Sequence, residues 1–369
     1  MFSCKNKDYS LPNQFITISE DFVLSHYQFN NEDCNRVLGS SNGLICMLSE
    51  YIYQYGNVQN FHLRFWNPAT RSVSKIVGCV SNAFMDQHDY FRFSFGYDNT
   101  TGKYKVVAFS SVEVRVFTLG DKFWRIIQRF PLLPFRCTRT NTNEWDRNGG
   151  VYLCNSLNWF AIRSNNVGYN EWKDLNLSIE QFVITSLDLG TDSYTQLLPP
   201  RGFDEVPPVM PIVSVLMDCL CFCHYSNGND FVIWKMTEFR VEESWTKFLK
   251  FNFVDRHLIP LFENGYTMLF LSDQGHVVRY NRKDDKVERR KISDDIQRLI
   301  AMDYIVSLAS TCRKFTTQLQ ALALLIMMVH GGMIGRKEDW VTGAAISFNY
   351  STNNYVLLDV FLLGFFLSF

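Results

Sequence analysis

The sequence predicts an all-β fold built from repeated hairpins, and three features support this. Aromatic residues make up 15% of the chain, including 32 Phe and 17 Tyr, and such side chains favour strands over helices. Residues 182–198 form two apolar runs around Gly190–Thr191–Asp192, a sequence typical of a turn, and Pro199 and Pro200 then end the second run. The same pattern recurs along the chain.

Five copies of this hairpin can be aligned between residues 63 and 292. Their turns are separated by roughly 50 residues on average, the period of kelch-type propeller repeats. A further strand or strand pair precedes each copy, so each period holds three or four strands, enough for one propeller blade. We therefore predict a β-propeller-like fold with kelch-type blades. The hairpins are Leu63–Ile76, Glu113–Ile127, Phe182–Pro200, Phe231–Phe248 and His276–Ile292.

The two ends of the chain depart from this pattern, so we divide it into residues 1–38, 39–310 and 311–369. A sixth blade could combine Gln14–His26 with the segment near Tyr304. The hydrophobic tail after residue 310 contains Leu319–Ile334 and Tyr355–Phe369, and neither reaches the ~20 clean apolar residues of a spanning helix. Three interpretations of this tail remain open: it inserts in a membrane, it packs against the propeller, or it is a sequence foreign to the fold. We do not expect a membrane partner.

Composition narrows the possible partners and compartments. The net charge of −1 gives no overall field that would attract nucleic acid. No apolar signal region follows Met1, and the ten cysteines are scattered along the chain. We therefore expect reduced thiols and a cytoplasmic or nuclear protein.

Motifs for catalysis or cofactor binding are not found in the sequence. It lacks the common zinc-protease, nucleophile-elbow and phosphate-loop patterns. Cys219, Cys221 and Cys223 alternate before His224, but side chains on one strand face lie about 7 Å apart, too far for adjacent thiols to form a tetrahedral site alone. We interpret these cysteines as small buried side chains and predict neither metal nor cofactor.

The tryptophans fall into two groups. Those inside predicted strands, such as Trp66 and Trp159, are expected in the core. Trp145 and Trp172 instead lie in polar loops beside charged residues, a pattern typical of interface anchors, although a loop-capping contact is the alternative. Loop residues predicted to bind a protein partner are Trp145, Arg147, Trp172, Lys173, Arg201 and Phe203.

Six short segments occur in order along the chain: Ser41–Cys46, Phe65–Arg71, Phe95–Asp98 with Tyr104–Val107, Leu187–Thr191 with Leu198–Pro200, Trp234–Met236 with Glu243–Lys247, and Tyr304–Leu308. Together they resemble the F-box-associated domain of plant F-box/kelch-repeat proteins, and the resemblance extends from about Gly39 to about Leu308. Phe65–Arg71, for example, is similar to the family signature W-N-P-[AS]-T-[RK].

This resemblance implies a substrate-recognition part of a Skp1–cullin–F-box ubiquitin ligase, a non-enzymatic adaptor whose partner is a protein target. Residues 1–38 show none of the leucine-, arginine- and cysteine-rich helical sequence of an F-box, so Skp1 is expected as a partner only if an F-box is supplied. Two alternative interpretations of the chain's function remain: a secreted copper oxidase of the kelch type, and a truncated gene copy without function.

Overall fold

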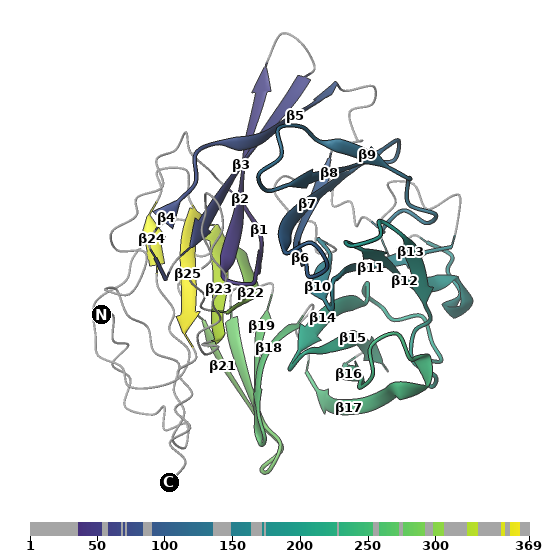
Figure 1. Cartoon of the computed structure of the whole chain (residues 1–369). Coiled ribbons are helices and arrows are strands. Elements are labelled where there is room, and N and C mark those ends of the chain that lie inside the picture. Colours follow the sequence, from purple (N-terminus) through teal and green to yellow (C-terminus); the bar gives the residue numbers. More distant parts are fainter. Residues whose placement is uncertain are drawn as a thin grey trace. The chain divides into compact units, whose positions relative to one another are not determined.

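In the computed structural model (Figure 1), the regular elements of the described residues are β-strands, apart from single 3-10 turns such as η2 (Ile179–Gln181) and η3 (Glu242–Ser244). The predicted all-β class is therefore confirmed. The structure describes residues 36–53, 58–67, 69–70, 72–83, 91–135, 149–163, 172, 175–226, 229–253, 258–272, 276–291, 298–305, 323–330, 348–350 and 355–361.

The chain divides into two compact units. Unit 1 comprises Met1–Ala83, Asp273–Val277 and Arg289–Phe369. Unit 2 comprises Phe84–Ser272 and Val278–Glu288.

Unit 1 contains two antiparallel sheets among its described residues. In sheet 1 the strands follow one another in the order β1-β2-β3-β4, and β5 also pairs with β3. In sheet 6 the order is β22-β23-β25-β24, and its first strand lies beside β1. The strands are β1 (Arg36–Ser41), β2 (Leu44–Tyr53), β3 (Val58–Asn67), β4 (Ser72–Val73), β5 (Val77–Ala83), β22 (Arg298–Ile305), β23 (Ala323–His330), β24 (Phe348–Tyr350) and β25 (Tyr355–Phe361).

Sheet 6 includes parts of the hydrophobic tail. Tyr304 lies in β22, which pairs with β23 from the tail, and β23 pairs in turn with β25. Gln14–His26, the other predicted member of a sixth blade, lies outside the described residues. In the part of the chain that the structure describes, no helix is long and apolar enough to cross a membrane.

Most of the remaining strands belong to unit 2 and form four sheets, each a four-stranded antiparallel meander in chain order. Sheet 2 is β6 (Arg92–Asp98), β7 (Lys103–Phe109), β8 (Val114–Thr118) and β9 (Arg125–Ile127); sheet 3 is β10 (Val151–Leu153), β11 (Ser156–Ile162), β12 (Phe182–Asp188) and β13 (Tyr194–Leu197). Sheet 4 is β14 (Ile212–Leu216), β15 (Cys219–Ser226), β16 (Asp230–Met236) and β17 (Trp245–Asn252); sheet 5 is β18 (Leu258–Asn264), β19 (Thr267–Ser272), β20 (His276–Asn281) and β21 (Lys286–Lys291).

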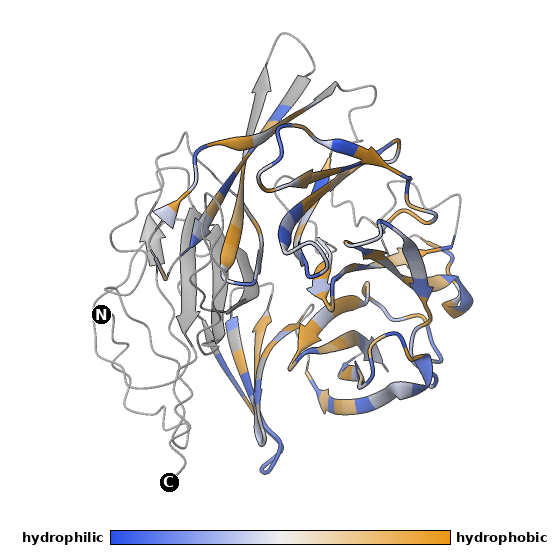
Figure 2. Cartoon of the chain, viewed as in Figure 1, coloured by the Kyte–Doolittle hydropathy of each residue, from blue (hydrophilic) through white to orange (hydrophobic). Residues whose placement is uncertain are grey.

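The first strands of these sheets are neighbours in space. β6 lies beside β10, β10 beside β14, and β14 beside β18. The middle strands are buried on both faces, with β11 buried along its whole length, whereas the last strand β17 has both buried and exposed residues. Figure 2 shows that β17 correspondingly mixes hydrophilic and hydrophobic residues. Sheets that meet through their first strands and expose their last strands are arranged like propeller blades.

The five predicted hairpins are confirmed, and each supplies the third and fourth strands of a sheet. In the third copy, the Asp188 carboxylate accepts hydrogen bonds from the N–H groups of Gly190 and Thr191 at 2.9 and 3.0 Å. In the first copy, Asn67 Oδ1 accepts from the N–H of Ala69 at 2.9 Å. Side chains of Asp and Asn that bond the backbone two or three residues ahead fix such turns locally, which is why the sequence could predict them.

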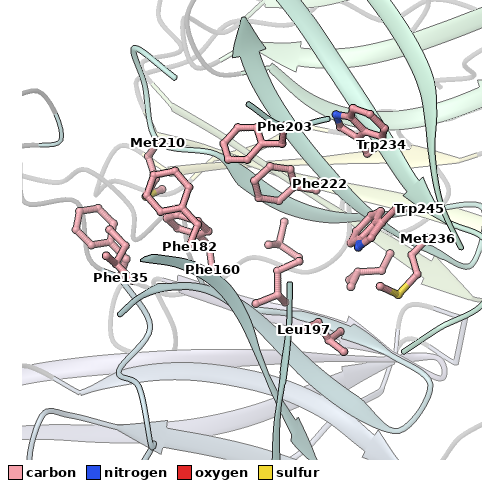
Figure 3. Packing of buried hydrophobic residues seen from close by; sticks show 14 of the residues in the cluster. Phe135, Phe160, Phe182, Leu197, Phe203, Met210, Phe222, Trp234, Met236 and Trp245 are labelled. Carbon is pink, nitrogen blue, oxygen red and sulfur yellow. The ribbon is translucent and has the colours of Figure 1, made fainter. Parts of the chain in front are cut away.

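An aromatic cluster fills the space between sheets 3 and 4 (Figure 3). Phe182 from β12 is fully buried and its ring lies 5.3 Å from that of Phe160 on β11. Phe222 from β15 approaches Phe160 at 6.4 Å between ring centroids. The two sheets therefore share one core. The predicted core tryptophans Trp66, Trp159, Trp234 and Trp245 are buried, and Trp124 packs edge-on against Phe93.

Gly96 on β6 offers a test of how closely sheets 2 and 3 pack. A Cβ atom at this position would lie 2.6 Å from the Tyr152 ring and 2.7 Å from Leu189 Cδ1. We expect Gly96→Ala to lower the free energy of unfolding by about 1 to 3 kcal/mol in a denaturant titration, because this contact has no spare room. Gly265→Asn serves as control: the space around it is open and Asn tolerates its φ of +50°, so a change within about 0.5 kcal/mol is expected. Equal stability of the two variants would contradict the close packing.

Candidate protein-binding surface

The meander places its connections at two ends of each sheet. Because successive strands alternate in direction, the turns after the first and third strands lie at one end, and the connections after the second and fourth strands leave from the other. Around sheet 3 the latter are long: residues 128–150, 163–181 and 198–211. Long connections on a rigid sheet framework are the usual place for binding residues. All six residues predicted to contact a partner fall within these three connections.

The short-turn end is occupied by contacts between sheets. Lys105 Nζ lies 2.9 Å from Asp98 Oδ2 within sheet 2 and also donates to the carbonyl oxygen of Leu189 in sheet 3. Both side chains of this ion pair are buried. Burial raises the pKa of Asp98, but the hydrogen bonds from Lys105 and Thr101 outweigh it, so the pKa is lowered overall.

Similar contacts continue from sheet 3 to sheet 4. Arg240, in the connection between β16 and β17, donates to Ser156 Oγ at 2.9 Å and lies 3.6 Å from Asp188 Oδ2. From sheet 4 to sheet 5, Lys235 Nζ lies 3.3 Å from Glu263 Oε2. These polar groups already have partners within the protein, so the short-turn end serves mainly to hold the sheets together.

Trp172 connects the three long connections at the other end. Its side chain is 8% exposed, and its indole N–H donates to the carbonyl oxygen of Pro207 at 2.8 Å. Its ring lies 5.7 Å from that of Phe135 and 5.6 Å from that of Phe182. Phe135 belongs to residues 128–150 and Pro207 to residues 198–211, so a single side chain joins all three segments. This is the loop-capping contact that the sequence left open as an alternative.

Phe203 is likewise turned into the protein (Figure 3). It is 5% exposed, and its ring lies 5.1 Å from Phe222 and 4.7 Å from His224. Its neighbour Gly202 has a φ of +91° and lies against the Trp234 ring, where an added Cβ would be 3.3 Å from the nearest ring atom. The backbone of residues 200–204 is therefore fixed closely on sheet 4.

Arg201, in contrast, is exposed. Its side chain is 87% accessible, and its Nη2 atom lies 3.4 Å from Glu243 Oε1 in η3. That contact places Arg201 beside the connection between β16 and β17. The remaining predicted residues, Trp145, Arg147 and Lys173, lie outside the described residues.

The structure also shows which residues the sequence reasoning missed. Phe135 and Pro207 were not predicted, although they position Trp172. Neither has a local signal, since an apolar residue in a loop gives no indication of which distant side chain it contacts. Their role is visible only once sheets 3 and 4 are placed together.

The His224 ring packs against the Phe203 ring, and each of its two nitrogens has a hydrogen-bond partner. Trp234 donates its indole N–H to His224 Nε2 at 3.2 Å, so the proton of the neutral ring is on Nδ1, which lies 3.3 Å from the carbonyl oxygen of Tyr225. Burial lowers the pKa of His224 to about 4. The preceding Cys221 and Cys223 are buried as interpreted, whereas Cys219 is only half-buried. Burial raises the pKa of the Cys223 thiol to about 12. Within the described segments, no three His, Cys, Asp or Glu residues are grouped to hold a metal ion.

Comparison with known proteins shows that part of this chain is similar to plant F-box proteins. Residues 1–159 match the model of the F-box associated beta propeller domain. In Arabidopsis thaliana, F-box/kelch-repeat protein At3g23880 is 24% identical over 68% of this chain and 62% of its own length. Putative F-box protein At1g33530 is 26% identical over 64% of this chain, and F-box protein CPR1 is 26% identical over 57%. The chain spans 62%, 46% and 51% of the lengths of these three relatives.

Removing the charge of Lys105 should destabilise the protein strongly. In Lys105→Met the buried Asp98 carboxylate loses its counter-ion, and we expect the free energy of unfolding to fall by about 3 to 5 kcal/mol in a denaturant titration. Adding Asp98→Asn should recover much of this loss, because the neutral amide can still cap the following turn. A single variant within about 1 kcal/mol of the parent protein would show that the pair does not hold this end together.

The buried imidazole of His224 should make stability depend on pH. From pH 6.5 down to about 4, the unfolded chain takes up a proton that the folded protein does not, so the free energy of unfolding falls as pH falls through this range. The free energy of unfolding lost between these two pH values is roughly 3 kcal/mol, and none of it is lost above pH 6.5. His224→Gln should flatten this part of the profile in denaturant titrations at a series of pH values. An unchanged slope in the variant would assign the dependence to other groups.

Proposed function

We infer, from the F-box associated β-propeller sequence of this chain and its distant homology to plant F-box/kelch-repeat proteins over part of its length, that it recognises a protein target for a Skp1–cullin–F-box ubiquitin ligase. In this role the chain is a non-catalytic adaptor, and other subunits transfer ubiquitin. The family resemblance seen in the sequence is confirmed as a distant relationship over part of the chain, and the predicted β-propeller-like fold is confirmed as well.

The observation that carries this proposal is the contrast between the two ends of sheet 3. One end is closed by the contacts of Arg240 with Asp188 and by the turn-capping Asp188 side chain, whereas long connections leave from the other end and are joined by Trp172. Such an arrangement supports a binding surface made of loops on a rigid base.

Within this proposal the six predicted residues have different roles. Trp145, Arg147 and Lys173 are proposed as direct contacts with the target. Trp172 and Phe203 are buried and serve to position the loops, while Arg201 offers a charged contact on the side of sheet 4. We further propose that the protein acts in the cytoplasm or nucleus, and that it reaches Skp1 only in a form that carries an F-box.

The proposal can be tested by affinity capture from plant cells treated with a proteasome inhibitor. The double variant Trp145→Ala/Arg147→Glu should reduce recovery of the target by about tenfold or more, because aromatic and arginine anchors dominate protein interfaces. The control Lys283→Glu changes an exposed basic residue in the turn between β20 and β21, at the short-turn end, and should leave recovery unchanged.

Each captured protein should then be retested with purified components and followed for ubiquitination and half-life in cells. We expect more ubiquitin on the target and a shorter half-life when a form of the protein that carries an F-box is present. A target that binds the double variant equally well, or whose half-life is unaffected, would contradict the proposed role.

A further inference from the structure

The outer edge of sheet 2 presents an unusual apolar surface. β9 is the last strand in the order β6-β7-β8-β9, and among the described residues no strand pairs with its outer side. Phe123, just before the strand, is 80% exposed, and Ile126 within it is 67% exposed. We call the surface formed by Lys122, Phe123, Ile126 and Arg129 the β9 surface.

The other outer strands of the same kind show how unusual this is. β13 exposes Thr195 and Gln196, β17 exposes Thr246 and Lys247, and β21 exposes Lys286. Lysine and small polar residues on an edge strand discourage pairing with another chain. Within these four strands the exposed large apolar side chain is Ile126 of β9, and Phe123 adds a second one just before the strand.

β9 is held firmly from its inner side. Trp124 lies 5.4 Å from Phe117 between ring centroids, and Ile127 packs against the core shared by sheets 2 and 3. Arg125 forms an ion pair at 2.6 Å with Asp192, and the Tyr194 hydroxyl donates to the carbonyl oxygen of Gln128 at 2.7 Å. A partner would therefore meet a strand that is already in place, which reduces the entropy cost of binding.

The charges at this edge favour an acidic partner. Arg125 is paired with Asp192, and Lys103 lies 3.9 Å from Asp121. Lys122 and Arg129 are exposed, and neither has an ion-pair partner in the described part of the chain. Two uncompensated cations thus flank the exposed apolar residues.

We propose that β9 is a docking site for an extended segment of a partner protein, one with apolar residues flanked by Asp or Glu. The segment adds as a strand to sheet 2: every second residue of β9 directs its N–H and C=O groups away from β8, and the partner's backbone pairs with them. Phe123 and Ile126 contact its apolar side chains, and Lys122 and Arg129 contact its carboxylates. A second copy of this chain is a poorer fit, because two β9 surfaces would bring like charges together. The site does not depend on the proposed loop surface.

The experiment is a selection from a phage-displayed library of random 12-residue peptides against the intact protein. We expect peptides with β-branched or aromatic residues flanked by Asp or Glu, and binding that weakens as salt is raised. Hydrogen exchange at residues 123–128 should slow when a selected peptide is bound.

Three variants separate the contributions. Phe123→Thr/Ile126→Thr copies the polar edge of β13 and should weaken peptide binding by about tenfold or more, and Lys122→Gln/Arg129→Gln should weaken binding and remove its salt dependence. Lys283→Glu is the matched control and should bind like the parent protein. Because the altered side chains are exposed, a thermal melt should show all three variants folded.

Several results would overturn the proposal. Selected peptides without acidic residues, or peptides that bind the Phe123→Thr/Ile126→Thr variant equally well, would do so. So would a concentration-dependent dimer of the parent protein that this same variant abolishes, since the occupant of the edge would then be a second copy.

Discussion

The fold depends on the fact that a four-stranded sheet cannot cover its own faces. β11 and β12 are buried on both sides, so sheet 3 needs a neighbour on each face. Phe160 and Phe182 meet Phe222 of sheet 4 on one side, and Trp159 packs with Phe109 of sheet 2 on the other. Each sheet is therefore stable only within the series, as in other repeat proteins whose units contact their neighbours.

Because each sheet needs its neighbours, the two ends of the sheets differ in the contacts that hold them. Ion pairs such as Lys105–Asp98 can be buried at the short-turn end because neighbouring turns supply the remaining hydrogen-bond partners. Around sheet 3, described residues of the three longer connections meet at one side chain, because Trp172 contacts Phe135 and donates to the carbonyl oxygen of Pro207. A surface of this kind can vary in sequence at its exposed positions while the base remains constant, which suits a module that recognises other proteins.

Much of the fold could be predicted because its signals are local. Asn67 and Asp188, for example, accept hydrogen bonds from the backbone of their own turns. The candidate site was harder to predict. The pattern of an aromatic residue flanked by charged residues predicted Trp172 as an interface anchor. The same pattern occurs at Phe123, between Lys122 and Arg125, and of these two aromatic side chains Phe123 is the exposed one.

The sequence by itself determined the all-β class, the five hairpins, their turns and the family resemblance, because these depend on residues close together in the chain. The tertiary structure decided which apolar side chains are covered. Phe135 and Pro207 contact Trp172 from segments on either side of it in the sequence, and the buried Lys105 ammonium donates a hydrogen bond to the carbonyl oxygen of Leu189 in the next sheet. Burial is a property of contacts between distant segments, so no local pattern can specify it.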